Sequence, residues 1–259
     1  MKRTAKLVGG ILMLSLLALG WLYQRVFWVE VPEGQSAAPV HELWDTLVKQ
    51  HVTPDGQVDY PGFAGDRERL EAYLDLLAIQ PPNTTTWSDA EQMAYWINVY
   101  NAFTVQIVLD HYPVGSIREI TPGIPFINSV WDEPLITLGG KSYTLNNIEH
   151  GILRTQFQDA RIHAVLTCAS ISCPKLRTEA YIPGRLDEQL DVQMQEFLRN
   201  PNKNQPDPES PKLSAIFNWY GGDFEAEGGL IVFVNRFLDQ QITAGAQVEF
   251  LEYDWGLNE

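Results

Sequence analysis

The stretch from Ser88 to His111 constrains the fold more than any other part of the chain. Ser88-Asp-Ala-Glu91 has the pattern of a capping box, in which the serine and glutamate side chains satisfy free N–H groups at a helix start. Between Met93 and Val108 apolar residues occupy nearly every side of a helical wheel. A helix that is apolar almost all round must be enclosed by protein. The sequence therefore predicts a buried central helix from Ser88 to about His111.

Two asparagines lie within this predicted helix, close to Trp96. Asn98 and Asn101 stand three residues apart, so they share one face of the helix. A buried amide without a partner costs about 1–3 kcal/mol, so both side chains need hydrogen bonds. Two interpretations stay open. The amides tie down neighbouring backbone, or together with Trp96 they bind substrate.

Hydrophobic periodicity predicts further elements on both sides of the central helix. The expected helices are 39–50, 67–77, 145–154, 186–198 and 230–238; the expected strands are 161–168, 212–220 and 248–253, with a hairpin over 134–143. Gly139-Gly140 suits the hairpin turn because glycine accepts positive φ. Helices and strands mix without regular β-α-β alternation. We therefore expect one α+β domain over residues 37–259, rich in helix and with a small, mainly antiparallel sheet.

The N-terminus has the pattern of a membrane-directing segment. Lys2, Arg3 and Lys6 precede an uncharged apolar run from Leu7 to Tyr23, which is at the short end of a membrane-spanning helix. Positive charges before such a run favour an orientation in which the following domain is exported. No convincing Ala-x-Ala cleavage site follows, which favours a retained anchor over a removed signal peptide. We expect residues 1–36 to form a signal anchor and tether.

The charge balance narrows the choice of partners. The chain carries 18 basic and 33 acidic side chains, a formal net charge of −15. Such a surface repels nucleic-acid phosphates, so no nucleic acid is expected as a partner. The glycine pairs lack the strand-to-helix context and the lysine of a phosphate-binding loop. Eight tryptophans among many acids suggest sugar binding, but no pair of acids has a position that indicates a glycosidase.

The only two cysteines of the chain, Cys168 and Cys173, stand five residues apart. In a regular strand over 161–168, Cys168 and His163 face opposite sides, with Cys168 among the apolar residues. Cys173 precedes Pro174, a residue that suits the first position of a helical turn. There, exposed amide groups and the helix dipole favour a thiolate. These patterns predict Cys173 as the nucleophile and Cys168 as a core residue.

A nucleophilic thiol needs a base and a group that orients the base. His163 and His150 are the candidates for base, and Glu149, beside an apolar helix stripe, is the candidate orienting group. Two structural alternatives stay open. In an oxidising compartment the two cysteines form a disulfide. A zinc site from both histidines and both cysteines is the weaker alternative, because Cys-x4-Cys lacks the paired Cys-x2-Cys pattern.

Four motifs in this order resemble the domain of unknown function 547 family: 93–102, 144–154, 163–174 and 253–258. The resemblance implies an exported bacterial protein with a thiol-protease-type fold, of the cysteine-protease or transglutaminase kind. It also implies a site of cysteine, histidine and glutamate, with a link to glutathione. Carried over to matching positions, the implied site residues are Glu149, His150, His163, Cys168 and Cys173.

The combined hypothesis is a thiol-dependent hydrolase or acyltransferase that acts on an amide or thioester of a peptide-like small molecule. It is expected in the bacterial cell envelope, anchored in the inner membrane with its domain in the periplasm. No cofactor or metal is expected, and glutathione is a candidate ligand. The alternative is a non-catalytic envelope module that binds a peptide or small molecule and carries a structural Cys168–Cys173 disulfide.

Overall fold

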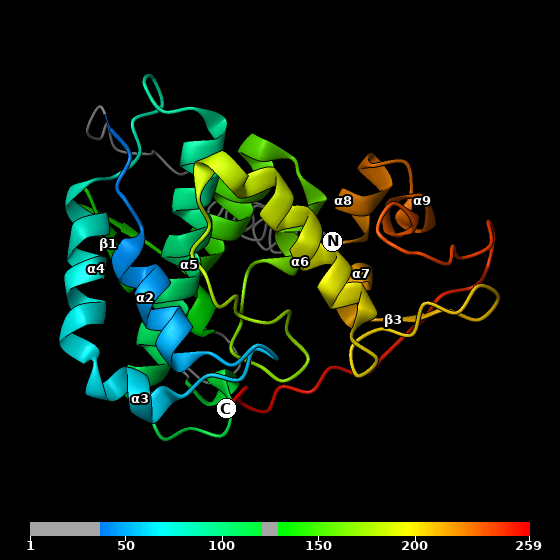
Figure 1. Cartoon of the computed structure of the whole chain (residues 1–259), viewed down its shortest axis with the longest axis horizontal. Coiled ribbons are helices and arrows are strands. Elements are labelled where there is room, and N and C mark those ends of the chain that lie inside the picture. Colours follow the sequence, from blue (N-terminus) through cyan, green and yellow to red (C-terminus); the bar gives the residue numbers. More distant parts are fainter. Residues whose placement is uncertain (1–36, 121–128) are drawn as a thin grey trace, which may run out of the picture.

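The predicted central helix is present as α5, Asp89–His111, in a computed structural model that describes residues 37–120 and 129–259 (Figure 1). Its capping box is confirmed: Ser88 Oγ accepts from the Glu91 N–H, and Glu91 Oε2 accepts from the Ser88 N–H at 2.7 Å. Every residue from Gln92 to Val105 is buried. The helix is therefore the axis of the larger of two hydrophobic clusters.

Three helices from the first part of the domain pack in this larger cluster: α2 (Glu42–His51), α3 (Tyr60–Gly65) and α4 (Arg67–Ile79). Short helices η1 (Ile117–Glu119) and η2 (Val130–Asp132) follow α5. The predicted signal anchor and tether, residues 1–36, lie outside the described residues. Within the described ranges, no helix is both long and apolar enough to cross a membrane.

A second hydrophobic cluster lies at the other end of the molecule. It contains α7 (Ala215–Trp219), α8 (Gly221–Ala226) and α9 (Leu230–Asn235), which Figure 1 shows at the end opposite to α4. Helix α6 (Leu186–Arg199) contributes side chains to both clusters. The η4 helix, Ala160–Ala164, does the same, so the two clusters meet there.

Within residues 37–120 and 129–259, the strands form two small separate sheets instead of one mainly antiparallel sheet. β1 (Ile136–Leu138) and β2 (Lys141–Tyr143) pair antiparallel across Gly139 and Gly140, both at positive φ, which confirms the predicted hairpin. β3 (Lys212–Leu213) and β4 (Glu249–Phe250) pair in parallel. The prediction of one helix-rich domain is confirmed, but its strands are fewer and shorter than expected.

Two predicted strands are about half helical. The segment 161–168 begins inside η4, and most of 212–220 forms α7. Hydrophobic periodicity cannot distinguish a short buried strand from a short buried helix. The side chains of Asp159 and Ser214 favour helix in these two segments, because each accepts a backbone hydrogen bond at the start of its helix. The predicted helix 230–238 is also shorter than expected, ending as α9 at Asn235.

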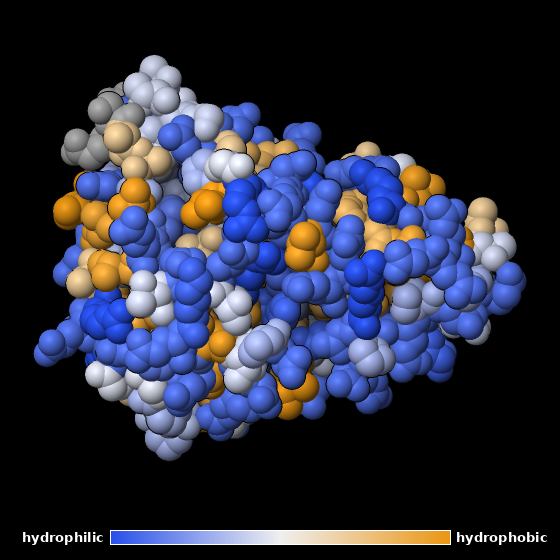
Figure 2. All heavy atoms as spheres, in the orientation of Figure 1, coloured by the Kyte–Doolittle hydropathy of each residue, from blue (hydrophilic) through white to orange (hydrophobic). Residues whose placement is uncertain are grey.

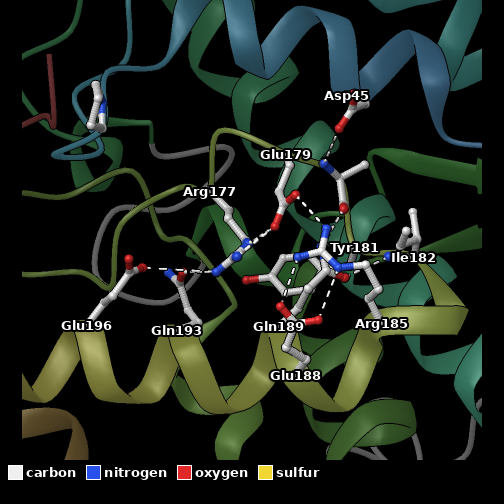
Figure 3. A network of polar contacts seen from close by, with 12 residues as sticks. Asp45, Arg177, Glu179, Tyr181, Ile182, Arg185, Glu188, Gln189, Gln193 and Glu196 are labelled. Carbon is white, nitrogen blue, oxygen red and sulfur yellow. Dashed lines mark hydrogen bonds and ion pairs between the residues drawn. The ribbon is translucent and has the colours of Figure 1, made fainter.

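Polar side chains attach the segment after the cysteines to α6, as Figure 3 shows. Gln189 accepts from the Ile182 N–H and donates to the Ala180 carbonyl, both at 2.9 Å. Glu179 accepts from Arg177 and Arg185, next to the short η5 helix (Pro183–Arg185). On the outside, the face in Figure 2 is mostly hydrophilic with scattered apolar residues, which fits the large net charge.

Candidate active site

A cavity of about 190 Å³ is lined by four of the five predicted catalytic residues. Both hydrophobic clusters contribute to its lining, so it lies where they meet. Six aromatic side chains line it together with both cysteines, a carboxylate and a histidine. The lining residues are Tyr100, Trp131, Asn146, Glu149, His163, Leu166, Cys168, Cys173, Ile216, Trp219, Tyr220, Tyr253 and Trp255.

The Glu149 segment forms a π-helix, η3 (Asn147–Phe157), where the sequence predicts an α-helix over 145–154. Thr144 Oγ1 accepts from the Asn147 N–H at 2.9 Å, and Asn147 Oδ1 accepts from the Thr144 N–H at 3.0 Å. π-Helical turns are rare and frequently occur at functional sites, where they change which side chains share a face. Here Glu149 is buried in the cavity lining.

The neighbouring His150 is directed elsewhere. It is absent from the cavity lining, and its Nδ1 lies 3.0 Å from a guanidinium nitrogen of Arg154. Burial lowers the pKa of His150 below its ordinary value. Among the described residues, neither Glu149 nor a cysteine forms a hydrogen bond with this ring. The structure therefore does not bring His150 into one site with the thiols.

His163 is the histidine that lines the cavity, and it is held by Asp223. Its Nε2 lies 2.7 Å from Asp223 Oδ2, and its ring stacks on Tyr220 with 3.8 Å between centroids. Arg154 donates two further hydrogen bonds of 2.7 Å to the same carboxylate. Burial raises the pKa of the Asp223 carboxyl, but the bonds from His163 and Arg154 outweigh it and hold the pKa well below its ordinary value.

This pairing fixes the tautomer of neutral His163. An ionised carboxylate only accepts hydrogen bonds, so Nε2 carries the proton and Nδ1 carries the free lone pair. Nδ1 has no hydrogen bond to any residue in the described ranges. His163 therefore has the arrangement of an oriented base, with Asp223 in the role that the sequence assigns to Glu149.

Cys168 is the more accessible cysteine, contrary to the prediction that it is a core residue. It is half-buried, and its Sγ lies 3.1 Å from both Ser170 Oγ and the Tyr253 hydroxyl. Burial raises the pKa of the Cys168 thiol, but hydrogen bonds from Cys173, Ser170 and Tyr253 outweigh it and bring the pKa below its ordinary value. These contacts stabilise a thiolate that faces the cavity.

Cys173 has the opposite environment. Only 2% of the residue is exposed, and its Sγ accepts the Cys168 backbone N–H at 2.8 Å. No helix begins at Pro174, so the predicted helix N-terminus at Cys173 is wrong. Burial, together with the neighbouring Cys168, raises the pKa of the Cys173 thiol well above its ordinary value. Both cysteines are free thiols in this structure.

The backbone around Cys168 is held from two sides. On one side, Asn101 of α5 donates to the Val165 carbonyl and accepts from the Thr167 N–H, both at 2.9 Å. On the other side, the chain turns at Ala169, which has a φ of +56°. This lies in the left-handed region, which residues other than glycine rarely adopt. Backbone strain of this kind is concentrated at functional sites.

The C-terminal segment covers the cysteine loop. The Ile171 N–H donates to the Gly256 carbonyl at 2.8 Å, and the Ser172 N–H donates to the Asp254 carbonyl at 3.1 Å. These bonds bring Tyr253 and Trp255 to the cavity. We call Trp131, Trp219, Tyr253 and Trp255 the aromatic wall, because their rings contact one another with centroids 4.6–5.9 Å apart.

The three residues considered for substrate binding on α5 do not line this cavity. Trp96, Asn98 and Asn101 are at most 1% exposed. Asn98 donates to the Tyr181 carbonyl at 2.8 Å and accepts from the Tyr181 N–H at 3.1 Å. Both asparagines thus satisfy their amides with backbone, which corresponds to the other interpretation left open by the sequence.

Sequence reasoning missed Asp223, the partner of His163. It lies 60 residues away, on α8, and its own surroundings in the sequence carry no motif. The hydroxyl of Tyr253 was missed as a thiol partner, although Tyr253 opens the C-terminal motif. In the part of the chain that the structure describes, no group of three His, Cys, Asp or Glu side chains is placed to hold a metal ion.

Fold and site together define a helix-rich domain with a thiol and a carboxylate-held histidine in one cavity. Residues 84–198 match the family model described as "Protein of unknown function, DUF547", so the chain carries a DUF547 domain over this range. The match includes Glu149, His163 and both cysteines but not Asp223 or Tyr253. Comparison with curated proteins gave no match, and comparison with solved structures gave none either.

Proposed function

We propose that this protein is a thiol-dependent hydrolase or acyltransferase that acts on an amide or thioester of a peptide-like small molecule. Cys168 is the nucleophile and His163 is the base. One observation carries the proposal: a single cavity is lined by the Cys168 thiol and by a His163 ring whose second nitrogen is held by Asp223. Nucleophile, base and orienting group are the three parts that thiol catalysis needs.

The chemistry proceeds in two steps. His163 takes the Cys168 thiol proton at Nδ1, and the resulting thiolate attacks the carbonyl carbon, so a carbon–sulfur bond forms. Protonated His163 then gives its Nδ1 proton to the leaving amine or thiol as the original carbonyl bond breaks. In the second step His163 takes a proton from water or from an acceptor amine or thiol, which attacks the acyl-enzyme and releases Cys168 as thiolate. Water gives hydrolysis, and the other acceptors give acyl transfer.

The choice of Cys168 over the predicted Cys173 is supported by access and by charge. Cys168 is half-buried and receives hydrogen bonds that favour its thiolate, whereas Cys173 is enclosed and donates toward the Leu166 carbonyl at 3.6 Å. A thiolate, not a thiol, is the reactive form of cysteine. Cys173 thus acts as a positioning residue, with its sulfur accepting the backbone N–H of Cys168 at 2.8 Å.

The proposal also covers the protein families to which the fold is related and the place of the protein in the cell. The set of cysteine, histidine and carboxylate favours a distant relation to cysteine proteases or transglutaminases. The basic and apolar pattern of residues 1–36 favours a domain tethered to the inner membrane on its periplasmic side. Glutathione and its thioesters are candidate substrates there, because they are small, peptide-like and carry amides.

Alkylation followed by intact-mass measurement tests the nucleophile. Reduced protein treated with a limiting amount of iodoacetamide at pH 7 is expected to gain one adduct, on Cys168. Cys168→Ser should abolish this fast labelling, and Cys173→Ser should retain it. Hydrolysis of a small glutathione thioester should follow the same pattern.

Two outcomes contradict the proposal. One is fast labelling that persists in Cys168→Ser and disappears in Cys173→Ser. The other is a stable disulfide between the cysteines in protein isolated from its own compartment, which would favour the non-catalytic binding module.

A further inference from the structure

Glu149 is a carboxylate buried in the wall of the cavity. It is 6% exposed and is the one acidic side chain in the cavity lining. Its Oε2 accepts from the Tyr100 hydroxyl at 3.3 Å, and it also interacts with the hydroxyl of Tyr220. Among the described residues, no basic side chain lies within ion-pairing distance of it. A buried charge is costly unless it is paired, so a cationic group beside Glu149 would be stabilised.

The nearby basic groups of the described residues form no ion pair with Glu149. Arg154 is committed to Asp223 through two hydrogen bonds of 2.7 Å, and no lysine or arginine belongs to the cavity lining. Burial and the Glu149 charge raise the pKa of both Tyr100 and Tyr220, so these phenols stay neutral donors. No lysine or arginine of the described residues is thus paired with Glu149, so a cationic group of a ligand would complete an ion pair there.

The rest of the lining suits a cation as well. Ring faces attract cations within about 6 Å, tryptophan most strongly. The aromatic wall supplies three tryptophans and a tyrosine. Arg118 already places its guanidinium carbon 5.0 Å from the Trp255 ring centroid, so the protein itself uses one ring of this cluster to hold a cation.

We propose that the cavity binds the ammonium group of its ligand, with Glu149 as the counter-ion and aromatic rings around it. The cavity of about 190 Å³ is slightly larger than the ~150 Å³ that hold a benzene-sized molecule, so it takes one amino-acid-sized group. The inference rests on the proposed function in one respect: it makes the substrate an amide or thioester with a free amino group near the reacting carbonyl. A ligand group with only negative charge would face Glu149 and be repelled.

Two isosteric probes test the ammonium site directly. Glycinamide and glycolamide differ in that an ammonium replaces a hydroxyl, and an α-amino group is largely protonated at pH 6.5. Each is titrated against the full chain with Cys168→Ser, which binds without turnover, and tryptophan fluorescence reports occupancy. We expect glycinamide to bind about tenfold more tightly than glycolamide, the factor given by ~1.4 kcal/mol.

Variants assign the preference to Glu149. Glu149→Gln should bring the two affinities within about twofold, because it removes the charge and keeps the shape. Glu149→Asp keeps the charge and should keep part of the preference. Glu252→Gln, at an exposed position outside the cavity lining, makes the same change in net charge and should leave the preference intact.

Equal binding of the two probes, no binding of either, or a preference that survives Glu149→Gln overturns the ammonium site. The proposed function fails separately, through the labelling of Cys168. If the protein prefers glycinamide but Cys168 is not reactive, the ammonium site is supported and the proposed thiol-dependent activity is contradicted. If Cys168 is labelled fast but the two probes bind equally, the proposed activity is supported and the ammonium site is contradicted.

Discussion

Two chemically identical thiols, five residues apart, have opposite environments. The Cys168 sulfur lies 3.1 Å from two hydroxyl oxygens, and both can donate to a thiolate. Cys173 is enclosed, and the negative charge of its neighbour opposes its own ionisation. One thiolate is therefore favoured at the expense of the other. Reactivity at this scale depends on individual hydrogen bonds.

Removal of the Tyr253 hydroxyl tests this account. Tyr253→Phe keeps the ring and loses one hydrogen bond to the Cys168 sulfur, so the pKa of Cys168 should rise. A hydrogen bond to a charged group contributes about 1.5–3 kcal/mol, so alkylation at pH 7 should slow by about tenfold to a hundredfold. A time course of iodoacetamide adducts by mass spectrometry measures the rate. Tyr112→Phe, whose hydroxyl binds Glu259 instead, is the matched control, and equal rates in both variants would refute the account.

Helix α5 acts as a frame for two loops through two asparagines. Asn98 holds the backbone of Tyr181, and Asn101 holds the backbone on both sides of Leu166, just before Cys168. Both amides are buried, and each makes one donor and one acceptor bond. They differ only in the loop that they support, so their variants form a matched pair.

Asn98→Ala and Asn101→Ala should each lower the free energy of unfolding by about 2–4 kcal/mol, because each leaves a backbone N–H and a carbonyl unpaired in the core. Urea unfolding measures this loss. Only Asn101→Ala should also change the rate at which Cys168 is alkylated in the folded protein, since only Asn101 supports the cysteine loop. Equal alkylation rates in the two variants would show that the loop keeps its shape without Asn101.

At the scale of the whole molecule, the free energy of unfolding depends on pH because folding buries a histidine in its uncharged form. His41, before α2, is 6% exposed, and its Nδ1 lies 2.7 Å from the Tyr73 hydroxyl. Burial lowers the pKa of His41 from 6.5 to about 4. Because the folded pKa lies below the unfolded one, the unfolded chain binds the proton first as the pH falls. Stability is thus full above pH 6.5, declines toward pH 4 and then levels off.

The loss from this one histidine should be about 3 kcal/mol between pH 7 and pH 4, as an order of magnitude. Urea unfolding at several pH values measures it. His41→Gln should flatten the profile over this range, whereas His111→Gln on the exposed end of α5 should not. A profile with the same slope in His41→Gln and the parent chain would exclude His41 as the cause.

Local patterns determined a large part of this protein. The capping box and all-round apolar pattern predicted α5, and the glycine pair predicted the β1–β2 hairpin. Amphipathic spacing located α2, α4 and α6 within a few residues. These features depend on neighbours within one or two turns of chain, which is the range over which periodicity carries information.

Only the tertiary structure decided the site. Asp223 holds His163 from 60 residues away, and Tyr253 reaches the Cys168 sulfur from 85 residues away. A periodic pattern also does not reveal that the segment with Glu149 and His150 forms a π-helix. Which cysteine ionises depends on burial and on hydrogen-bond donors that are distant in the sequence. The spacing of the two cysteines predicts neither. The sequence determined that a thiol, a histidine and carboxylates are present, whereas the packing of α8 and the C-terminal segment selected the ones that meet.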